Sequence, residues 1–240
     1  MELSGLTDKG LKRTNNEDSF VISKKWKYII LADGMGGHLG GEVASSTITR
    51  QLSKFIENSF PAVIYDPDAM LKIASEIDEI NKSILKQGSE NTGLKGMGAT
   101  LSFLLVLENK VGYINVGDSR IYQVRDDKIQ QLSEDDSVVN DLFRNGMISS
   151  SERRLHPLKN IITKAIGTDA GLSVKPQYAD FLKNDLFILC SDGLSDMIED
   201  DEILETVLKH RNTGRICKEL INKANKYGGR DNITVVVCKI

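Results

Sequence analysis

The chain has 240 residues, of which 40% are hydrophobic, and its 31 basic and 34 acidic residues give a formal net charge of -3. A chain of this length can bury a sizeable core, and we expect one domain over residues 1–240. Neither charge sign forms a long run, which argues against a nucleic-acid-binding surface and against a patch for anionic membranes.

The N-terminal part contains three predicted strands. Met1–Leu6 lacks the basic and apolar regions of a signal peptide, and no stretch approaches the roughly 20 apolar residues of a transmembrane helix, so we expect a cytoplasmic protein without a membrane partner. Apolar and β-branched residues predict strands at residues 3–7, 19–23 and 28–32. The polar stretch Arg13–Asp18 is most simply a solvated loop.

The third predicted strand ends in Asp33, which is followed by a glycine-rich segment. Gly34 has access to backbone conformations closed to other residues, which leaves its carbonyl uncrowded. A carboxylate and a bare carbonyl are hard oxygen ligands, suited to Mg²⁺ or Mn²⁺, although a lone Asp-Gly is most simply a hairpin turn. Two nucleotide-binding motifs fail here, because the P-loop would need Lys at Glu42 and the dinucleotide fingerprint would need Gly at Leu39.

The next segment changes from helical to extended periodicity. Apolar residues at helical spacing predict helices over residues 42–58 and from Asp66–Pro67 to Gly88. Four strands joined by short connections follow, which we interpret as one antiparallel meander, at residues 99–107, 111–116, 121–124 and 129–132. Asp118 lies between the second and third of them and is most simply a turn residue.

The C-terminal half leaves the predicted sheet and then returns to it. Residues 134–167 lack strand character, and they contain a short helix ending near Gly146 and a possible capping box from Ser149 to Glu152. The remaining predicted elements are a strand at 181–190, two helices within 200–226 and a strand at 233–238 that is buried on both faces.

The three cysteines do not predict thiol chemistry. Cys190, Cys217 and Cys238 are odd in number and widely spaced, which favours core packing over disulfides or a zinc site. A cysteine-dependent phosphatase would need Arg six residues after its nucleophile, but Asp196 and Lys223 occupy those positions after Cys190 and Cys217.

Acidic residues recur at the ends of the predicted buried strands. Asp192 follows one strand and Asp231 precedes another, as Asp33 follows the third. Gathered carboxylates repel one another unless cations compensate, so their convergence would imply bound metal. Two divalent ions about 3.5–4 Å apart can lower the pKa of a shared water and clamp an in-line displacement at phosphorus. Arg13 could then grip a phosphate through its planar guanidinium.

Six motifs, in order along nearly the whole chain, resemble the motif set of the metal-dependent protein serine/threonine phosphatases, the protein phosphatase 2C family, in its bacterial form. They are Arg13-x-x-Asn-Glu-Asp18, Ala32-Asp-Gly-Met-Gly-Gly-His38, Gly96-Met-Gly-Ala-Thr100, Val116-Gly-Asp-Ser-Arg-Ile-Tyr122, Cys190-Ser-Asp-Gly-Leu194 and Arg230-Asp-Asn-Ile-Thr234. Each motif is weak alone, but the ordered set is specific. The resemblance implies an α+β fold, a four-layer α-β-β-α sandwich with two central antiparallel β-sheets flanked by helices.

The resemblance also implies roles for the site residues around two Mn²⁺ or Mg²⁺ ions. The implied metal ligands are Asp33 as the bridge, the Gly34 carbonyl, Asp192 and Asp231, with Glu17 acting through a water, Asp18 supporting the water shell and Asp118 holding a third, weaker ion. Arg13 would bind the substrate phosphate, and residues 145–166 would form a mobile flap beside the site.

At two positions the sequence departs from the family pattern, which leaves the general acid and the contact of one loop undetermined. Met35 stands where many relatives have a histidine that is proposed as the general acid, so the proton for the leaving group must come from a metal-bound water, from His38 or from solvent. A simpler interpretation of His38 is that it orders the glycine loop. Asp135–Asp136 stands where relatives often have Asp-His, which leaves the contact of that loop undetermined.

We therefore expect a phosphoprotein phosphatase that hydrolyses phosphoserine and phosphothreonine in one step, by attack of a water or hydroxide held between two divalent metals. The alternative is a catalytically silent phosphoprotein-binding module of the same fold, which loss of a metal ligand would indicate, and no matched ligand is missing. A metal-dependent nuclease is disfavoured by the net negative charge. The expected partners are phosphoserine and phosphothreonine proteins and a cognate Ser/Thr kinase, without nucleic acid, and we expect a monomer.

Overall fold

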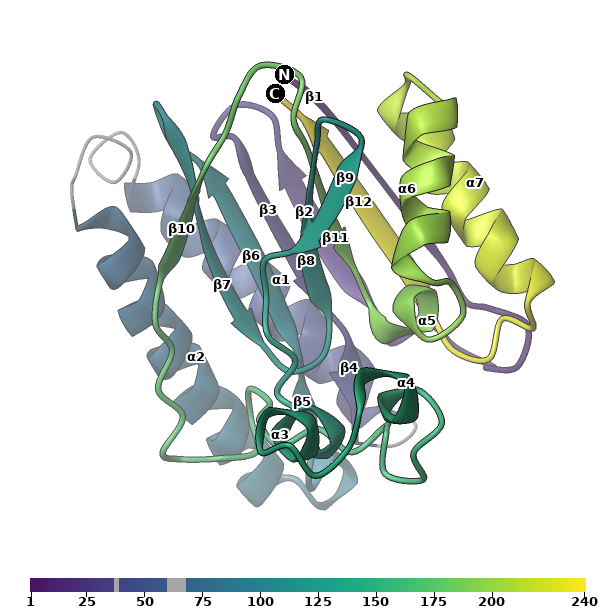
Figure 1. Cartoon of the computed structure of the whole chain (residues 1–240). Coiled ribbons are helices and arrows are strands. Elements are labelled where there is room, and N and C mark those ends of the chain that lie inside the picture. Colours follow the sequence, from purple (N-terminus) through teal and green to yellow (C-terminus); the bar gives the residue numbers. More distant parts are fainter. Residues whose placement is uncertain (37–38, 60–67) are drawn as a thin grey trace.

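The computed structural model describes residues 1–36, 39–59 and 68–240, and within them two five-stranded antiparallel sheets form the centre of the molecule (Figure 1). The first sheet has the order β1-β12-β11-β8-β9, with β1 at Glu2–Asp8, β12 at Ile233–Lys239, β11 at Leu186–Cys190, β8 at Arg120–Arg125 and β9 at Lys128–Gln131. The second has the order β10-β7-β6-β3-β2, with β10 at Gln177–Asp180, β7 at Lys110–Val116, β6 at Leu101–Val106, β3 at Tyr28–Ala32 and β2 at Ser19–Ser23. A small ribbon pairs β4 (Gly34–Met35) with β5 (Gly98–Ala99).

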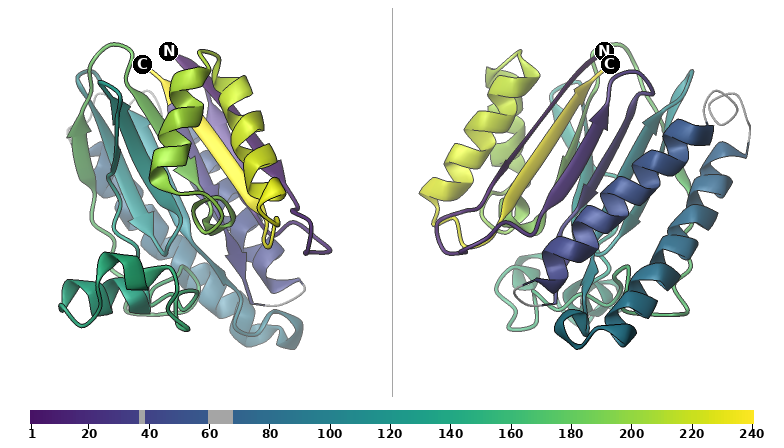
Figure 2. Two further views of the ribbon diagram at one scale, coloured as in Figure 1. Left: turned by 45° about the vertical axis from the view of Figure 1, so that its right-hand side comes forward. Right: turned by 180° about the vertical axis from the view of Figure 1, so that it is seen from behind.

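Helices cover both outer faces of the paired sheets, as the views in Figure 2 show. Against the second sheet lie α1 (Gly40–Ser59) and α2 (Ala69–Glu90), and the single turn η1 (Thr92–Leu94) follows α2. Against the first sheet lie α5 (Asp192–Ser195), α6 (Asp200–Lys209) and α7 (Thr213–Lys226). Two short helices, α3 (Val138–Arg144) and α4 (Ser150–Arg153), lie at the end of the sandwich opposite the two chain termini (Figure 1). The predicted four-layer α+β sandwich is confirmed.

The described residues contain three apolar clusters, one in each space between adjacent layers. One packs the second sheet on α1 and α2, another packs the first sheet on α5 to α7, and a third lies between the two sheets. Because both faces of the central strands are covered, these strands are almost wholly apolar. In β12, Val235 and Val237 face the helices while Val236 and Cys238 face the opposite sheet, so the prediction of burial on both faces is confirmed.

The prediction of one four-stranded meander is wrong. The pair β6–β7 belongs to the second sheet, whereas β8–β9 belongs to the first, so the chain crosses between sheets after β7. Gly117 makes this crossing with a φ of +95°, and a Cβ there would lie 2.7 Å from Thr100 Cγ2. A side chain at Gly117 would therefore be both strained and crowded. The crossing places Asp118 at the end of both sheets. A short polar turn has the same sequence pattern whether it joins two paired strands or crosses between sheets, so the sequence could not distinguish the two cases.

The predicted strand at 181–190 is also longer than the observed one. β11 begins at Leu186, and the preceding residues 177–180 form β10, which pairs with β7 in the other sheet. The change of sheet is fixed by Asp185, whose carboxylate accepts hydrogen bonds from Arg125, from Gln123 and from the backbone N–H of Leu182. The polar run Lys183-Asn184-Asp185 interrupts the apolar pattern here, so the start of the strand predicted at 181 was too early.

Most helix boundaries agree with the sequence. The capping box at Ser149 and Glu152 is present at the start of α4, and α3 ends two residues before Gly146. The predicted helix start at Asp66–Pro67 lies outside the described residues. Where the chain is described, none of its helices combines the length and the apolar character that crossing a membrane requires.

Candidate active site

Acidic residues from both sheets meet at the end of the sandwich that carries α3, α4 and α5. Asp33 follows β3, Asp192 begins α5 directly after Ser191 at the end of β11, and Asp231 lies two residues before β12. Cys190 of β11 pairs with Val235 of β12, which places Asp192 and Asp231 at the same end of these two strands. The structure thus brings together the three acids that the sequence placed at strand ends.

The charges of these acids destabilise one another. Burial, followed by repulsion from Asp18 and Asp192, raises the pKa of Asp33 well above its ordinary value. Burial, followed by repulsion from Asp118 and Asp231, likewise raises the pKa of Asp192 well above its ordinary value. Such mutual repulsion is what a set of cation ligands experiences when no cation compensates it.

Asp18 connects the two sheets through its carboxylate. Its Oδ2 atom accepts hydrogen bonds from Ser191 Oγ at 2.8 Å and from Thr234 Oγ1 at 2.6 Å. Its Oδ1 atom is shielded from solvent and has no hydrogen-bond partner among the described residues. Burial raises the pKa of Asp18 to about 6, even though both hydroxyl hydrogen bonds favour the charged form. This oxygen is therefore available to accept a hydrogen bond from water or to bind a cation.

Asn232 holds the loop that carries Arg13 and Glu17 against the first sheet. Its Oδ1 atom accepts the backbone N–H of Glu17 at 2.8 Å, and its Nδ2 atom donates to the carbonyls of Lys9 and Asn15, both at 2.9 Å. The sequence motif that contains Asn232 gave this residue no predicted role. Its place between a metal-ligand candidate and a buried strand is the signal that would have identified it.

Gly34 is required for a different reason from the predicted one. It lies in the short strand β4, and its φ is outside the left-handed region. A Cβ at Gly34 would overlap the carbonyl of Gly41 at the start of α1 and would lie 2.6 Å from the Glu17 carbonyl. Close approach of three backbone segments, rather than conformational freedom, therefore excludes a side chain here.

The backbone of Asp33 is fixed by a buried hydroxyl pair. The N–H of Asp33 donates to Thr100 Oγ1 at 3.0 Å, and the carbonyl of Asp33 accepts the N–H of Thr100 at 2.9 Å. Thr100 Oγ1 in turn lies 2.8 Å from Ser119 Oγ, and both residues are buried. Both residues lie within the sequence motifs, but the sequence did not predict this role for them.

Arg13 reaches the acidic cluster from the first loop. Its Nη2 atom donates to Asp231 Oδ2 at 2.6 Å, while Asp231 Oδ1 accepts the backbone N–H of Asn232 at 2.8 Å. The Arg13 side chain is 52% exposed, so the guanidinium lies at the boundary between the acids and solvent. This pair uses one of the five N–H donors of the guanidinium and leaves the others available to a ligand.

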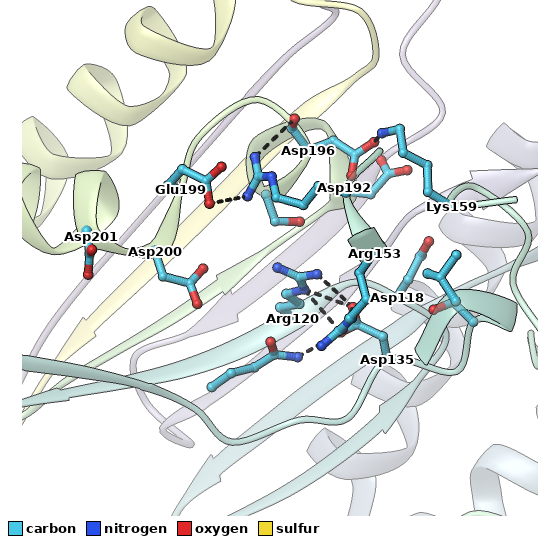
Figure 3. Close-up of a pocket in the computed structure, with 15 residues that line it drawn as sticks. Asp118, Arg120, Asp135, Arg153, Lys159, Asp192, Asp196, Glu199, Asp200 and Asp201 are labelled. Carbon is cyan, nitrogen blue, oxygen red and sulfur yellow. Dashed lines mark hydrogen bonds and ion pairs between the residues drawn. The ribbon is translucent and has the colours of Figure 1, made fainter. Parts of the chain in front are cut away.

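Two cavities lined by described residues border the acids. The larger, of about 250 Å³, lies between the α3–α4 segment and α5–α6, and Asp118 and Asp192 line it (Figure 3). The smaller, of about 200 Å³, is lined by Asp192, Asp231 and Arg13. Asp118 faces the first cavity, and burial together with repulsion from Asp135 raises its pKa to about 6.

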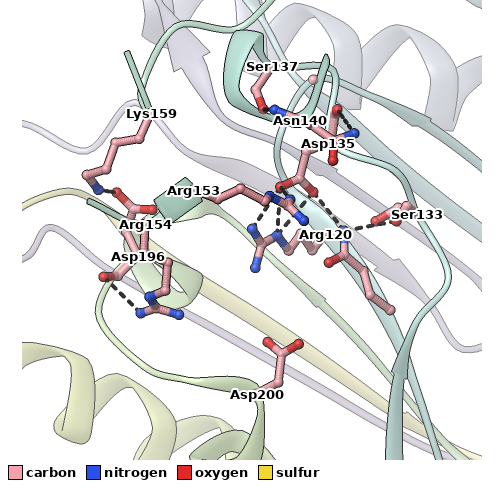
Figure 4. Close-up of polar contacts among 12 residues, drawn as sticks. Arg120, Ser133, Asp135, Ser137, Asn140, Arg153, Arg154, Lys159, Asp196 and Asp200 are labelled. Carbon is pink, nitrogen blue, oxygen red and sulfur yellow. Dashed lines mark hydrogen bonds and ion pairs between the residues drawn. The ribbon is translucent and has the colours of Figure 1, made fainter. Parts of the chain in front are cut away.

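A buried ion pair supports the wall of the larger cavity (Figure 4). Arg120 donates from Nε and Nη2 to the carboxylate of Asp135, with a shortest distance of 2.7 Å, and Gln131 donates to the same carboxylate. Asp136 accepts the N–H of Gly117 at the crossing between sheets. The contact of the Asp135–Asp136 loop, left undetermined by the sequence, is therefore with the base of the turn that carries Asp118.

The predicted flap, residues 145–166, contacts the connection between α5 and α6 through ion pairs. Lys159 binds the Asp196 carboxylate, and Arg154 donates to Glu199 at 2.8 Å. Figure 3 shows Lys159 pointing toward Asp196 among the residues that line the larger cavity. His38, the candidate proton donor of the sequence analysis, lies outside the described residues.

The donor set fits hard divalent cations. Half-buried carboxylates, the Gly34 carbonyl and the unpartnered Oδ1 of Asp18 are all oxygen donors. Within the described ranges no group of three Asp, Glu, His or Cys side chains forms a complete coordination site for one ion. Such an arrangement suits Mg²⁺ or Mn²⁺ with a shell that includes water, because Mg²⁺ usually keeps several waters and takes only one or two carboxylates.

Comparison with known proteins places this geometry in context. A family model described as protein phosphatase 2C matches residues 11–232. The chain is 38% identical to the serine/threonine phosphatase stp of Listeria innocua, over 96% of this chain and 92% of that protein. It resembles the crystal structure of the serine/threonine phosphatase Stp1 from Staphylococcus aureus, with a TM-score of 0.94 and 35% identity over 100% of this chain and 94% of that one. The catalytic domain of the serine threonine protein phosphatase PstP, in complex with two manganese ions, gives a TM-score of 0.87 at 33% identity, over 98% and 96% of the two chains.

Proposed function

Since the chain belongs to the protein phosphatase 2C family and is a serine/threonine protein phosphatase, we propose that it hydrolyses phosphoserine and phosphothreonine in proteins at the acidic end of the sandwich. The observation that carries the proposal is the convergence of Asp33, Asp192 and Asp231 beside Arg13. Carboxylates that repel one another beside an exposed guanidinium form a site for cations and a phosphate together.

We propose that the site takes two Mn²⁺ or Mg²⁺ ions, a choice supported by the two manganese ions of the PstP structure. Divalent cations supply charge that polarises the phosphoryl oxygens and lowers the pKa of a bound water. The residues that would hold them are Asp33, the Gly34 carbonyl, Asp192 and Asp231, with Glu17 and Asp18 supporting their waters. Asp118, at the wall of the larger cavity, would hold a third and weaker ion.

The other roles fall to groups that position the substrate. Arg13 would bind the phosphate through the N–H donors that its pair with Asp231 leaves unused. Asn232 keeps the Arg13 loop in place through its contacts with Lys9 and Asn15. The proton for the departing serine or threonine oxygen would come from water or from His38, since Met35 cannot supply one.

Several properties of the whole chain complete the proposal. Residues 1–240 would act as one monomeric catalytic domain, with residues 145–166 as a flap that moves over the site. A cognate Ser/Thr kinase would supply the substrates, because each phosphoprotein that is hydrolysed must first be phosphorylated. Cys190, Cys217 and Cys238 are free thiols buried in the protein, which fits a cytoplasmic signalling enzyme in a reducing compartment.

Phosphate release from a phosphothreonine peptide tests the proposal. We expect release with Mn²⁺, none after chelation, and none from Asp192→Asn with Mn²⁺ restored. Asp180→Asn is the matched control, since Asp180 is an exposed strand residue of β10, and it should keep full activity. Release that continues in chelator would refute the metal-dependent reaction, whereas no release with any divalent metal would point to a silent phosphoprotein-binding module.

A further inference from the structure

The two internal ion pairs of the smaller cavity leave one cation and one acid of its described lining outside any ion pair. Three cations and three acids line it, together with Asn160, Gly193 and Met197. The cations are Arg13, Lys159 and Arg230, and the acids are Asp192, Asp196 and Asp231. Arg13 is bound to Asp231, and Lys159 is bound to Asp196. Arg230 is the remaining cation, and Asp192, the candidate metal ligand, is the remaining acid.

Arg230 differs from the other two cations in having no partner. Its side chain is exposed, and it makes no hydrogen bond or ion pair with any residue that the structure describes. A guanidinium presents five N–H donors in a planar fork that matches a carboxylate or a phosphate. The cavity therefore carries an unused anion-binding group next to the proposed phosphate-binding Arg13.

The turn that carries Arg230 is anchored to the loop that carries Arg13. The carbonyl of Gly229 accepts the backbone N–H groups of Leu11 at 2.8 Å and of Lys12 at 3.2 Å. Gly228 and Gly229 have φ values of +128° and +47°, which a residue with a side chain rarely adopts. Two arginines are thus presented to one cavity by two backbone segments that are hydrogen-bonded to each other.

We propose that Arg230 forms an anion subsite that binds an acidic group within two residues of the phosphorylated serine or threonine. The group would be an Asp or Glu carboxylate, or a second phosphate, because both match the guanidinium fork. This inference rests on the proposed phosphatase function and adds a preference among its substrates. Arg13 binds the phosphate that is removed, while Arg230 binds its acidic neighbour.

A panel of phosphothreonine peptides tests the subsite. The peptides differ only at positions one and two residues before or after the phosphothreonine, which carry alanine, glutamate, lysine or phosphoserine. The kcat/KM for phosphate release with Mn²⁺ is measured for each, with release from phosphoserine resolved by peptide mass. We expect glutamate or phosphoserine at one of these positions to exceed alanine by about three- to tenfold, and lysine to fall below alanine.

Variants assign the preference to Arg230. Arg230→Met should reduce the ratio of kcat/KM for an acidic peptide to kcat/KM for the alanine peptide to about one, and Arg230→Lys should retain part of this ratio. Arg230→Glu should have its highest kcat/KM for the lysine peptide. Lys226→Met is the matched control, since Lys226 is an exposed cation at the end of α7 that lines neither cavity, and it should keep the full ratio. Separate responses to glutamate and phosphoserine would show which acidic group the subsite prefers.

The outcomes separate this proposal from the phosphatase function itself. If no phosphopeptide releases phosphate, the proposed function fails. If the peptides are hydrolysed but the wild type shows no acidic preference, or Arg230→Met retains it, the subsite is refuted. If Arg230→Met slows every peptide by the same factor, Arg230 acts on the transferred phosphate or on Asp231, and the subsite is likewise refuted.

Discussion

The charge of Asp18 should destabilise the metal-free protein, and replacing it with a neutral isostere should stabilise that form. The pKa of Asp18 rises from 3.8 to about 6, principally because of burial. At about 1.4 kcal/mol per pKa unit, ionisation of the folded protein costs about 3 kcal/mol above pH 6. In Asp18→Asn the amide oxygen can still accept from Ser191 and Thr234, and the amide nitrogen can donate toward Asp33.

The sign of the pH dependence follows from the direction of the shift. Between pH 3.8 and 6 the folded state holds a proton on Asp18 that the unfolded state has lost, so stability falls as the pH rises through this window. The free energy of unfolding of Asp18→Asn should exceed that of the wild type by about 3 kcal/mol at pH 8 and by about 1 kcal/mol at pH 4.5. For a chain of this size, 3 kcal/mol corresponds to roughly 6–12 °C in melting temperature.

Thermal unfolding of metal-free protein followed by circular dichroism measures this difference. Asp185→Asn is the control, because the pKa of Asp185 is lowered by hydrogen bonds from Arg125 and Gln123 that outweigh its burial. It should melt below the wild type at pH 8, with a deficit that shrinks as the pH falls. An Asp18→Asn protein that melts at or below the wild type at pH 8 without metal would refute the reasoning. With saturating Mn²⁺ the order should reverse, since the wild type binds the ions more tightly.

Three further predictions concern the reaction. In steady-state kinetics with Mn²⁺, Asp231→Ala should lower kcat by roughly 100-fold or more through loss of a metal ligand, and a full rate would contradict this role. Arg13→Ala should chiefly raise KM and cost about 30-fold in kcat/KM, and an unchanged KM would contradict its binding of the phosphate. Asp118→Ala should still bind two Mn²⁺ per chain in a calorimetric titration, while its activity falls and the Mn²⁺ concentration that it requires changes. If the variant loses the two core ions, Asp118 is instead a structural support of the main site. His38→Ala should slow a phosphothreonine peptide far more than p-nitrophenyl phosphate, whose leaving group needs no proton, and equal losses would assign protonation to water.

Strand bounds were predictable where the apolar run is clearly delimited, in the partly exposed β2 as in the fully buried β3. β2 and β3 have the predicted bounds, because their apolar runs are bounded by polar residues at both ends. Sheet membership was not predictable, since the crossing at Gly117 and the short strand β10 depend on which strands pair. The pattern of apolar residues reports burial, and it does not report the neighbour against which a strand is buried.

The site was predictable as a set of acids, but its supports were not. Asp33, Asp192 and Asp231 stood out because a charge follows or precedes an apolar strand. Ser191 and Thr234 did not stand out, because small hydroxyl residues are common at strand ends and their contact with Asp18 crosses from one sheet to the other. Contacts between residues 173 and 216 positions apart carry no local sequence signal.

The construction of the site couples catalysis to the packing of the two sheets. Asp18 and Asp33 belong to the end of the second sheet, whereas Asp192 and Asp231 belong to the end of the first. Repulsion between these pairs pushes the sheets apart at this end, and the hydrogen bonds that Asp18 accepts from the first sheet oppose it. Cations that bind acids from both sheets add to the same restraint, because their binding energy is available only when the sheets are packed. A substitution in the apolar layer between the sheets should therefore weaken metal binding, even though it touches no ligand.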